Sequence, residues 1–484
     1  MSKTVLNTIN SEQSQRDLLE QANLGNAEAG FQWLLQSEQQ EQAQSDEDAQ
    51  KRVDLLVQAS NQNYAAASTL LGQWHLLGHY VPQDIQSAIL FFQHAAKLND
   101  ALAHLELFHI ARKGIVETLN SQQGLVHLQQ AVQLNHPEAI HIYAEALLNQ
   151  DAKKSQQLLL DNYLNHQYQS SLKLFVQYEG FNQDEVQRQL ENLATNDSFA
   201  CALLAFHYLK NNELEKAFKY AHIAQEQNDA YGCYIRALLE QKSKDGSSEI
   251  TQAFFLKAAN NGHVESAYIV AVELLKRSDV ETNEAEKNAL CQQAFTLMQQ
   301  AALAGNKDAQ YSFAQCLRHG LGTEKDAQLG LQWLERAAQN HHCDAQFELS
   351  MLLPIEHEQH IPLLMEAAKN GHIQAMLCMA IYEQRLNNTE DTLKWLHQAK
   401  DAHSARAHFL LAQIYRDGTG VEADAKESVE FLKQAADLGD IDAYFELFKA
   451  YKDGLGVRKN KKTAGKYLDL AKQSQHIEAA SIEY

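Results

Sequence analysis

The chain has 484 residues, a formal net charge of −21 at pH 7, 45% apolar residues and only four prolines. This acidic balance argues against a general nucleic-acid binder, because phosphate binding requires clustered lysine and arginine, and it fits a soluble protein or one with basic partners. The apolar content is enough for a continuous core, which argues against disorder. An ordinary chain of this length would form about two to four domains, whereas a repeat array is not limited in that way.

The N-terminal residues and the cysteines together predict a cytoplasmic protein. Residues 1–12 contain no apolar run of signal-peptide length, and no later segment reaches the ~18–20 apolar residues that span a bilayer. The six cysteines are scattered and form no Cys-x-x-Cys pair, which is typical of reduced thiols in small core positions. We therefore expect no membrane insertion.

The first predicted elements are a cap and a group of repeats. Residues 11–24 are predicted to form an amphipathic helix that ends at Gly25, so that residues 1–25 close one end of the array. Residues 26–136 are predicted to be the first group of helical hairpins. Within them, residues 36–48 are polar on all sides and are expected to form a solvated loop or a frayed helix.

A small residue marks the first helix of each hairpin, and we call it the anchor. Four pairs of successive anchors lie 36 residues apart; in the better copies a glycine follows eleven places later, and a pair of small residues ends the preceding helix. Paired alanines let helix backbones approach closely, and glycine or asparagine supplies the left-handed conformation that ends a helix. The clear anchors are Ala67, Ala103, Ala139, Ala309, Ala345, Ala407 and Ala443.

The rest of the chain carries weaker or longer copies of the same unit. Residues 137–265 mostly lack the glycine turn and are predicted to be shorter repeats with tighter loops. Residues 266–478 form the C-terminal group of hairpins, in which an acidic insertion at 279–286 is expected to be an exposed loop. Residues 479–484 form a C-terminal tail. The anchors, weak ones included, predict thirteen hairpins.

The consensus of these units resembles a known repeat family. The order Ala-x-x-x-Leu-Gly/Ala-x-x-Tyr-x-x-Gly-x-Gly-Val, then a helix ending in Ala-Ala-x-x-Gly, is similar to the Sel-1-like repeat (SLR), a relative of the tetratricopeptide repeat. It is clearest at 399–472 and 301–342, with helices expected at 405–417 and 424–438. The resemblance implies an all-α, right-handed α-solenoid of about thirteen stacked helix-turn-helix repeats. It also implies a protein-binding scaffold with bacterial relatives.

No motif of an enzyme occurs in the sequence. Residues 454–466 miss the phosphate-loop spacing, and the Gly-x-Gly turns lack the strand and third glycine of a dinucleotide site. The densest histidine groups, at 341–343 and 357–360, have no cysteine pair nearby to complete a zinc site. We therefore expect no catalysis, no cofactor and no bound metal. Histidines in the turn before an anchor are expected to cap helices or to lie on the surface: His136, His263 and His372.

Positions two, six and nine after the anchor form a stripe on the first helices, which we call the first-helix stripe. By resemblance to tetratricopeptide hairpins, this stripe faces the concave surface. Its aromatic, amide and basic groups suit the binding of a peptide. The cations could equally stabilise helix ends, and the aromatic residues could pack between repeats. The predicted partner-binding residues are Leu105, His109, Arg112, Tyr311, Gln315, Arg318, Phe409, Gln413, Arg416, Phe445, Lys449 and Lys452.

The sequence thus predicts a non-catalytic scaffold or adaptor that binds one or more proteins or peptides along the concave face of the solenoid. Two alternatives remain open. One is a ligand- or metal-responsive regulator or enzyme accessory protein, which a metal assay of the purified protein would test. The other is an exported protein that contacts a host or the cell envelope, which detection outside the cytoplasm would support.

Overall fold

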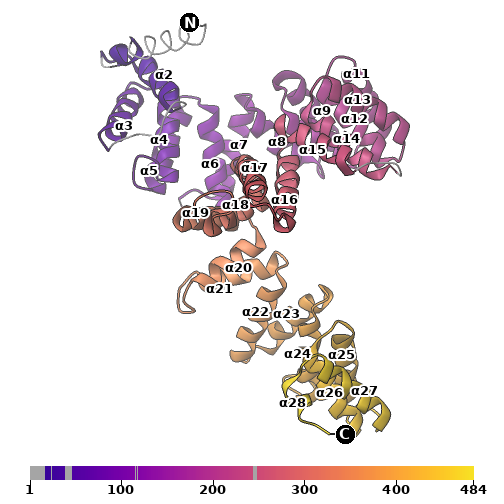
Figure 1. Ribbon diagram of the computed structural model, residues 1–484. Helices are drawn as coiled ribbons and strands as arrows, with labels where there is room; N and C mark the ends of the chain where they lie inside the picture. Colours follow the sequence, from indigo (N-terminus) through magenta and orange to yellow (C-terminus); the bar gives the residue numbers. More distant parts are fainter. Residues whose placement is uncertain are drawn as a thin grey trace. The chain divides into compact units, whose positions relative to one another are not determined.

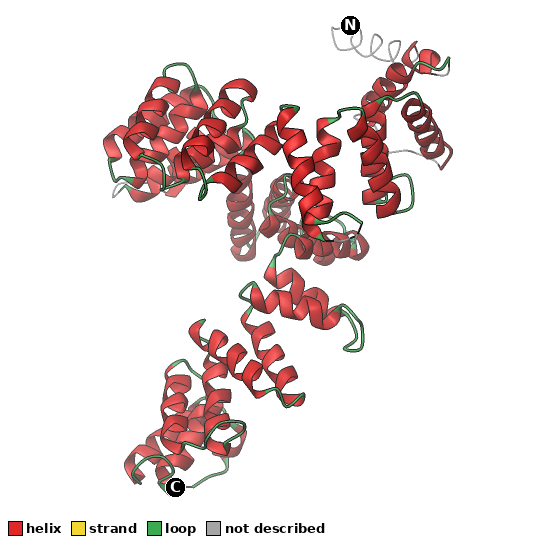
Figure 2. Cartoon of the chain, turned by 180° about the vertical axis from the view of Figure 1, so that it is seen from behind, coloured by secondary structure: helices red, strands yellow, loops and turns green. Residues whose placement is uncertain are grey.

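The computed structural model describes residues 17–22, 24–38, 46–114, 116, 118–243 and 248–483. These residues form helices joined by turns and short loops, and no strand occurs among them (Figure 2). Within each of the two compact units, most helices that are neighbours along the chain pack on one another, so that helical hairpins stack in sequence order. The predicted all-α solenoid of stacked hairpins is therefore confirmed.

The first of two compact units comprises Met1–Ala224 and is coloured indigo to magenta in Figure 1. Residues 17–22, which belong to the predicted cap, are helical, and residues 1–16 and 23 lie outside the described residues. The predicted polar segment 36–48 is helical at its two ends, and residues 39–45 lie outside the described residues. The helices are α2 Ala27–Glu38, α3 Asp46–Asn61, α4 Ala65–Leu77, α5 Ile85–Lys97, α6 Ala101–Lys113, α7 Ser121–Gln133, α8 Pro137–Leu147, α9 Ala152–His166, α10 Gln169–Gln177, α11 Gln183–Leu193 and α12 Ser198–Lys210.

The second unit comprises Gln225–Tyr484 and is coloured from magenta to yellow in Figure 1. Helix α13, Leu214–Glu226, contains the boundary between the units. No helix in the described part of the chain is both long enough and apolar enough to cross a membrane. The helices that follow are α14 Ala230–Lys242, α15 Ser248–Asn260, α16 Val264–Val280, α17 Glu284–Leu303, α18 Lys307–His319, α19 Ala327–Gln339, α20 Cys343–Leu352, α21 His360–Lys369, α22 Ile373–Arg385, α23 Thr389–Asp401, α24 Ala405–Asp417, α25 Ala425–Asp437, α26 Ile441–Asp453, α27 Lys461–Gln473 and α28 Ile477–Ala480.

Side-chain caps three residues before the anchors determine where the first helices begin. The Asp100 carboxylate accepts a hydrogen bond from the N–H of Ala103 at 2.8 Å, and the Ser404 hydroxyl accepts one from the N–H of Ala407 at 3.2 Å. Such caps satisfy an N–H group that has no partner within the first turn of a helix. At the other end of α24, Gly418 adopts a left-handed conformation with φ of 66°, which confirms the predicted end of this helix.

The core of each unit is built on small residues, as the spacing predicts. All seven clear anchors are 0% exposed, and the alanine pairs that end the second helices are at most 8% exposed. Close packing of helix backbones explains this, because a larger side chain at these positions would push neighbouring helices apart. Leucine, phenylalanine and tryptophan side chains such as Leu411, Phe92 and Trp333 fill the space around them.

We expect Ala314→Leu to destabilise the second unit by about 1–3 kcal/mol, because it overpacks a contact between α18 and α19. Ala314 is fully buried, and a Cβ atom on Gly330 of α19 would already lie 3.1 Å from the Ala314 carbonyl oxygen. Urea unfolding followed by circular dichroism measures the change. The control is Ala327→Leu, at an exposed position of α19. An equal midpoint for both variants would contradict the packing described here.

The prediction that the acidic insertion at 279–286 forms a loop is wrong. Helix α16 continues to Val280, and α17 begins at Glu284, so that only three residues separate them. The Asn283 side chain caps α17 through the N–H groups of the second and third residues that follow it, at 3.0 and 3.4 Å. Acidic residues in the first turn of a helix are favourable because they interact with its positive end. The insertion therefore lengthens both helices, to 17 and 20 residues, whereas α15 and α18 have 13.

Candidate functional site

The structure places position two of the first-helix stripe in the packing between repeats. Leu105, Phe409 and Phe445 are buried. Tyr311 is half-buried, and its ring stacks on that of His342 in the next hairpin, with 4.5 Å between the ring centroids. These four side chains thus offer little surface to a partner.

Positions six and nine of the stripe link neighbouring first helices. The Gln315 side chain donates a hydrogen bond to the carboxylate of Glu348 at 2.6 Å, and Arg318 forms an ion pair with the same carboxylate. In a later pair of hairpins, Arg416 forms an ion pair with Glu446 at 3.1 Å. Both glutamates lie three residues after an anchor. The polar groups of the stripe therefore form a ladder of contacts between repeats.

The remaining stripe residues lie closer to the surface. His109 faces the carboxylate of Glu138 at 3.6 Å, and Lys449 bonds to Glu446 at 2.9 Å. Arg112 and Lys452 are exposed, and the Lys452 ammonium lies over the ring of Phe448 at 5.6 Å. Gln413 lines a small cavity of about 90 Å³ near α22. A partner-binding role for the stripe stays a prediction.

Histidines cap four of the first helices in the second unit. Each side chain accepts a hydrogen bond from the N–H of the anchor three residues later, at 3.0–3.2 Å. Each ring also lies 4.2–4.5 Å from an aromatic ring of the preceding hairpin. This confirms the predicted capping role of His263 and His372, whereas His136 forms no side-chain cap. The four histidines and their aromatic partners are His263 with Tyr234, His342 with Tyr311, His372 with Phe347 and His476 with Phe445.

The capping geometry requires neutral imidazole rings. Because Nδ1 accepts a hydrogen bond, the proton must be on Nε2, which faces a carboxylate in all four cases, at 3.2–3.5 Å. Nε2 of His342 lies 3.4 Å from Asp308, and Nε2 of His372 lies 3.5 Å from Asp344. Burial lowers the pKa of both histidines, although the carboxylates act in the opposite direction. Among the described residues, no cluster of three or more histidine, cysteine or acidic side chains could hold a metal ion.

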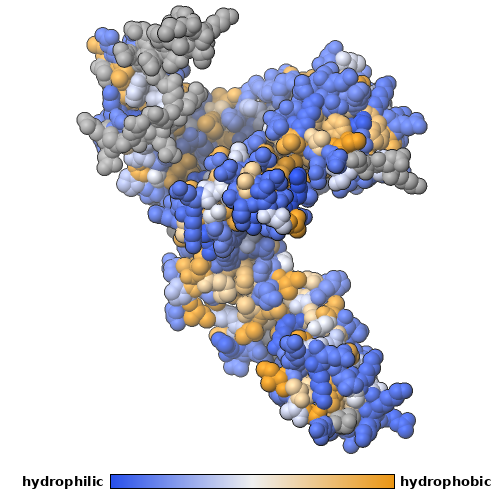
Figure 3. Space-filling model, in the orientation of Figure 1, coloured by the Kyte–Doolittle hydropathy of each residue, from blue (hydrophilic) through white to orange (hydrophobic). Residues whose placement is uncertain are grey.

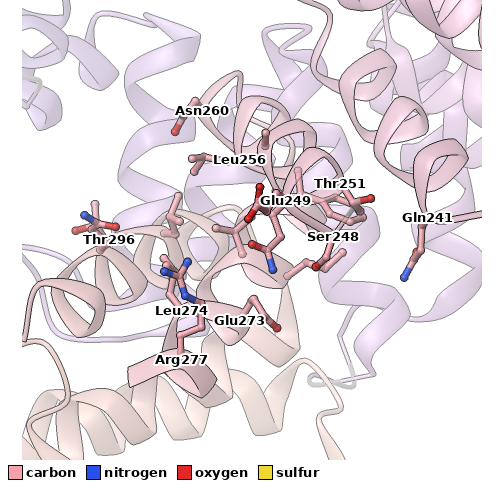
Figure 4. Close-up of a pocket in the computed structure, with 17 residues that line it drawn as sticks. Gln241, Ser248, Glu249, Thr251, Leu256, Asn260, Glu273, Leu274, Arg277 and Thr296 are labelled. Carbon is pink, nitrogen blue, oxygen red and sulfur yellow. The ribbon is translucent and has the colours of Figure 1, made fainter. Parts of the chain in front are cut away.

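An open groove lies over α15, α16 and α17 in the second unit, and we call it the α15–α17 groove (Figure 4). Its volume is about 1040 Å³. The long α16–α17 hairpin and the face of α15 form its walls, and Gln241 at the end of α14 closes one side. Apolar side chains form the floor, and polar side chains form much of the rim. The apolar lining residues are Ala253, Phe255, Leu256, Ile269, Val270, Leu274 and Leu297.

The α15–α17 groove presents apolar surface to solvent. Leu256 and Ile269 are 43% and 38% exposed, and nearby Ile250 is 49% exposed. The face of the molecule shown in Figure 3 is mostly hydrophilic, with separate apolar patches. Apolar patches bordered by polar residues mark sites of binding more often than isolated apolar side chains do.

Two charged residues of the α15–α17 groove have no partner in the described part of the chain. Glu273 and Arg277 lie one turn apart on α16 and line the groove, and neither forms an ion pair or a hydrogen bond. By contrast, Arg318 and Arg416 in later repeats are paired with carboxylates of the neighbouring hairpin. The charges of Glu273 and Arg277 are therefore available to a ligand.

The sequence did not predict the α15–α17 groove, because the predicted binding residues were taken from the first helices of the clearest repeats. The predicted stripe of α16 would use Tyr268, Val272 and Leu275, whereas the groove uses the neighbouring face of the same helix. Two signals could have located it. One is the extra length of the unit after Ser266, and the other is Arg277 beside an exposed apolar face.

Stacked hairpins with small anchors and a recurring 36-residue spacing define a helical-repeat protein of the solenoid class. The sequence model of the Sel1 repeat matches five stretches of the chain, which therefore contains Sel1 repeats. The matched residues are 65–100, 266–306, 307–342, 405–440 and 441–476. One of these stretches, 266–306, contains most of the long α16–α17 hairpin.

Known proteins resemble parts or most of the chain. The chitin synthase regulator SKT5 of Saccharomyces cerevisiae is 26% identical over 195 residues, which are 38% of this chain and 24% of that protein. The chain thus spans about a quarter of this curated relative. A crystal structure of a protective antigen of uropathogenic Escherichia coli, which displays an SLR fold, is 18% identical with a TM-score of 0.46, over 97% of this chain and 91% of the other. A Sel1 repeat protein from Oxalobacter formigenes is 22% identical with a TM-score of 0.41, over 46% of this chain and 94% of the other.

Proposed function

We propose that the protein is a non-catalytic scaffold or adaptor that binds segments of other proteins, and that the α15–α17 groove is one of its binding sites. The observation that carries this proposal is an open groove with an apolar floor and charged groups that have no partner within the described chain. An apolar surface of this kind gains free energy when a partner removes it from water.

The size and openness of the α15–α17 groove favour a polypeptide over a small molecule. Small-molecule sites usually have volumes of about 300–1,000 Å³ and enclose most of their ligand. This groove has a volume of about 1040 Å³, and exposed side chains such as Leu256 and Ile269 line it, so that it is open to solvent. Helical-repeat solenoids leave extended surfaces of this kind because each hairpin contacts only its neighbours.

The proposal extends to further contacts, to the location of the protein and to its role. Exposed cations of the first-helix stripe, Arg112 and Lys452, are proposed as further partner contacts. A cytoplasmic location is proposed because none of the six cysteines, all within the described residues, forms a disulfide, and four of them are buried. A regulatory role agrees with the similarity to a chitin synthase regulator, within the quarter of that protein that the chain matches.

Comparative affinity capture tests the proposed function. We expect the unchanged protein to retain partners that the double variant Leu256→Asp, Ile269→Asp loses, because two carboxylates in the apolar floor oppose burial by a partner. Leu438→Asp is the matched control, since Leu438 is 44% exposed in a different hairpin. Quantitative mass spectrometry of the captured proteins measures the difference. Identical captured sets for all three proteins would contradict a binding role for the groove.

A further inference from the structure

We infer that the α15–α17 groove binds an extended peptide segment that carries an acidic and a basic side chain two residues apart, beside apolar side chains. The carboxylate of the peptide pairs with Arg277, and its cation pairs with Glu273. This inference rests on the proposed function, because it specifies the partner of the same groove. The placement of the two unpartnered charges on one apolar wall of the groove carries it.

The charge argument begins with Arg277. Its guanidinium has five donors and no ion pair or hydrogen bond within the described chain, although the protein as a whole carries a net charge of −21. A guanidinium binds a carboxylate through two parallel hydrogen bonds, and such charge-assisted bonds are stronger than neutral ones. The adjacent apolar floor, including Leu274, reduces access of water to a bound pair. An acidic side chain is therefore the complementary group at this position.

The distance between Glu273 and Arg277 along α16 determines how far apart the two charged side chains of the peptide must be. Residues four apart on a helix are separated by about 6 Å along its axis. Alternate residues of an extended chain point to the same side and are separated by about 6.6 Å. An extended peptide that runs along α16 can thus place one side chain at Glu273 and the side chain two residues away at Arg277.

The rim of the α15–α17 groove favours an extended backbone over a helical one. Gln252, Asn260 and Gln293 line the groove, and their side-chain amides form no hydrogen bond within the described part of the chain. Each amide both donates and accepts hydrogen bonds. An extended peptide exposes N–H and C=O groups that need such partners, whereas a helix satisfies most of them internally. The 13 residues of α15 span about 20 Å, the length of about six extended residues.

A peptide library displayed on phage tests this inference with the full-length protein as bait. We expect peptides selected by the unchanged protein to share an acidic and a basic residue two apart with apolar neighbours. With Arg277→Glu as bait, the acidic preference should disappear, because the groove then holds a third carboxylate beside Glu249 and Glu273. A synthetic peptide of the selected sequence should bind Arg277→Glu about 10- to 100-fold more weakly, as expected for a lost charge-assisted bond, and Arg277→Lys less weakly than that.

Two different results would overturn different statements. If the unchanged protein and Arg277→Glu select the same peptides, while Leu256→Asp selects none of them, the groove binds peptides but the assigned chemistry is wrong. If Leu256→Asp selects the same peptides as the unchanged protein, the groove is not the binding site, and the proposed function fails with the inference. Circular dichroism of each variant confirms that the helices are intact. Arg277 and Leu256 are both exposed, so we expect both variants to fold.

Discussion

Replacing Gly456 with alanine is expected to destabilise the C-terminal hairpins by about 2–5 kcal/mol. Gly456 has a left-handed conformation with φ of 70°, which costs free energy for any residue with a side chain. A Cβ atom on Gly456 would also overlap the carbonyl oxygen of Ala425, in the second helix of the preceding hairpin. The turn or the helix would have to move, and the packing of the two hairpins would be lost. Urea unfolding and hydrogen exchange of residues 425–483 measure the effect.

Gly439→Ala is the matched control for this prediction. Gly439 also has a left-handed conformation, with φ of 88°, but a Cβ atom there would meet no other atom within 4 Å. Only the backbone strain of about 1–2 kcal/mol should remain. Equal free energies of unfolding for the two variants would contradict the close approach of the Gly456 turn to Ala425.

Lowering the pH from about 7.5 to about 5.5 is expected to lower the melting temperature by several degrees, because the folded chain disfavours histidine protonation. Burial lowers the pKa of eight histidines below the usual value, so the unfolded chain binds protons more readily than the folded one. This contribution to stability is complete above the unfolded pKa of about 6.5 and is lost as the pH falls towards the folded values. The eight residues are His104, His127, His136, His141, His207, His342, His372 and His397.

The double variant His342→Asn, His372→Asn isolates the capping histidines. In the folded protein these rings must be neutral, since Nδ1 accepts the N–H of Ala345 or Ala375. Asparagine keeps the cap without titrating, and the chain already uses it at the same place, where Asn306 accepts the N–H of Ala309 at 2.8 Å. We expect the variant to lose less stability on acidification than the unchanged protein. Equal losses would show that these two caps do not contribute to the pH dependence.

Most of the fold could be predicted from the sequence because helix capping and helix termination depend on residues only a few places apart. The caps at Asp100 and Ser404 are predictable because their side chains accept hydrogen bonds from free N–H groups at the start of a helix. The turn at Gly418 is predictable because glycine readily adopts the left-handed conformation that ends a helix. Even the histidine caps at His263 and His372 were open to sequence reasoning. The acidic insertion was misjudged because Glu284 and Glu286 are polar, like loop residues, but are equally suited to the start of a helix.

The candidate site depends on contacts between hairpins, which sequence spacing does not specify. Arg318 and Arg416 have the composition of a binding surface, yet their charges are used by Glu348 and Glu446 about thirty residues away. Whether a first-helix cation is paired inside the chain depends on which side chain the next hairpin brings to it. The same holds for Arg277, because only the stacked hairpins show that no carboxylate of the described chain forms an ion pair with it.

By itself, the sequence determined that this protein is a solenoid of helical hairpins, where the clear helices begin and end, and which small residues lie between them. These properties follow from helix periodicity, capping and side-chain size, all of which act locally. Only the tertiary structure decided that the second glycine of a turn, Gly456, touches the preceding hairpin and that the long α16–α17 hairpin leaves an open groove. Both depend on the distance between helices that are neighbours in space, and packing of the whole array sets that distance.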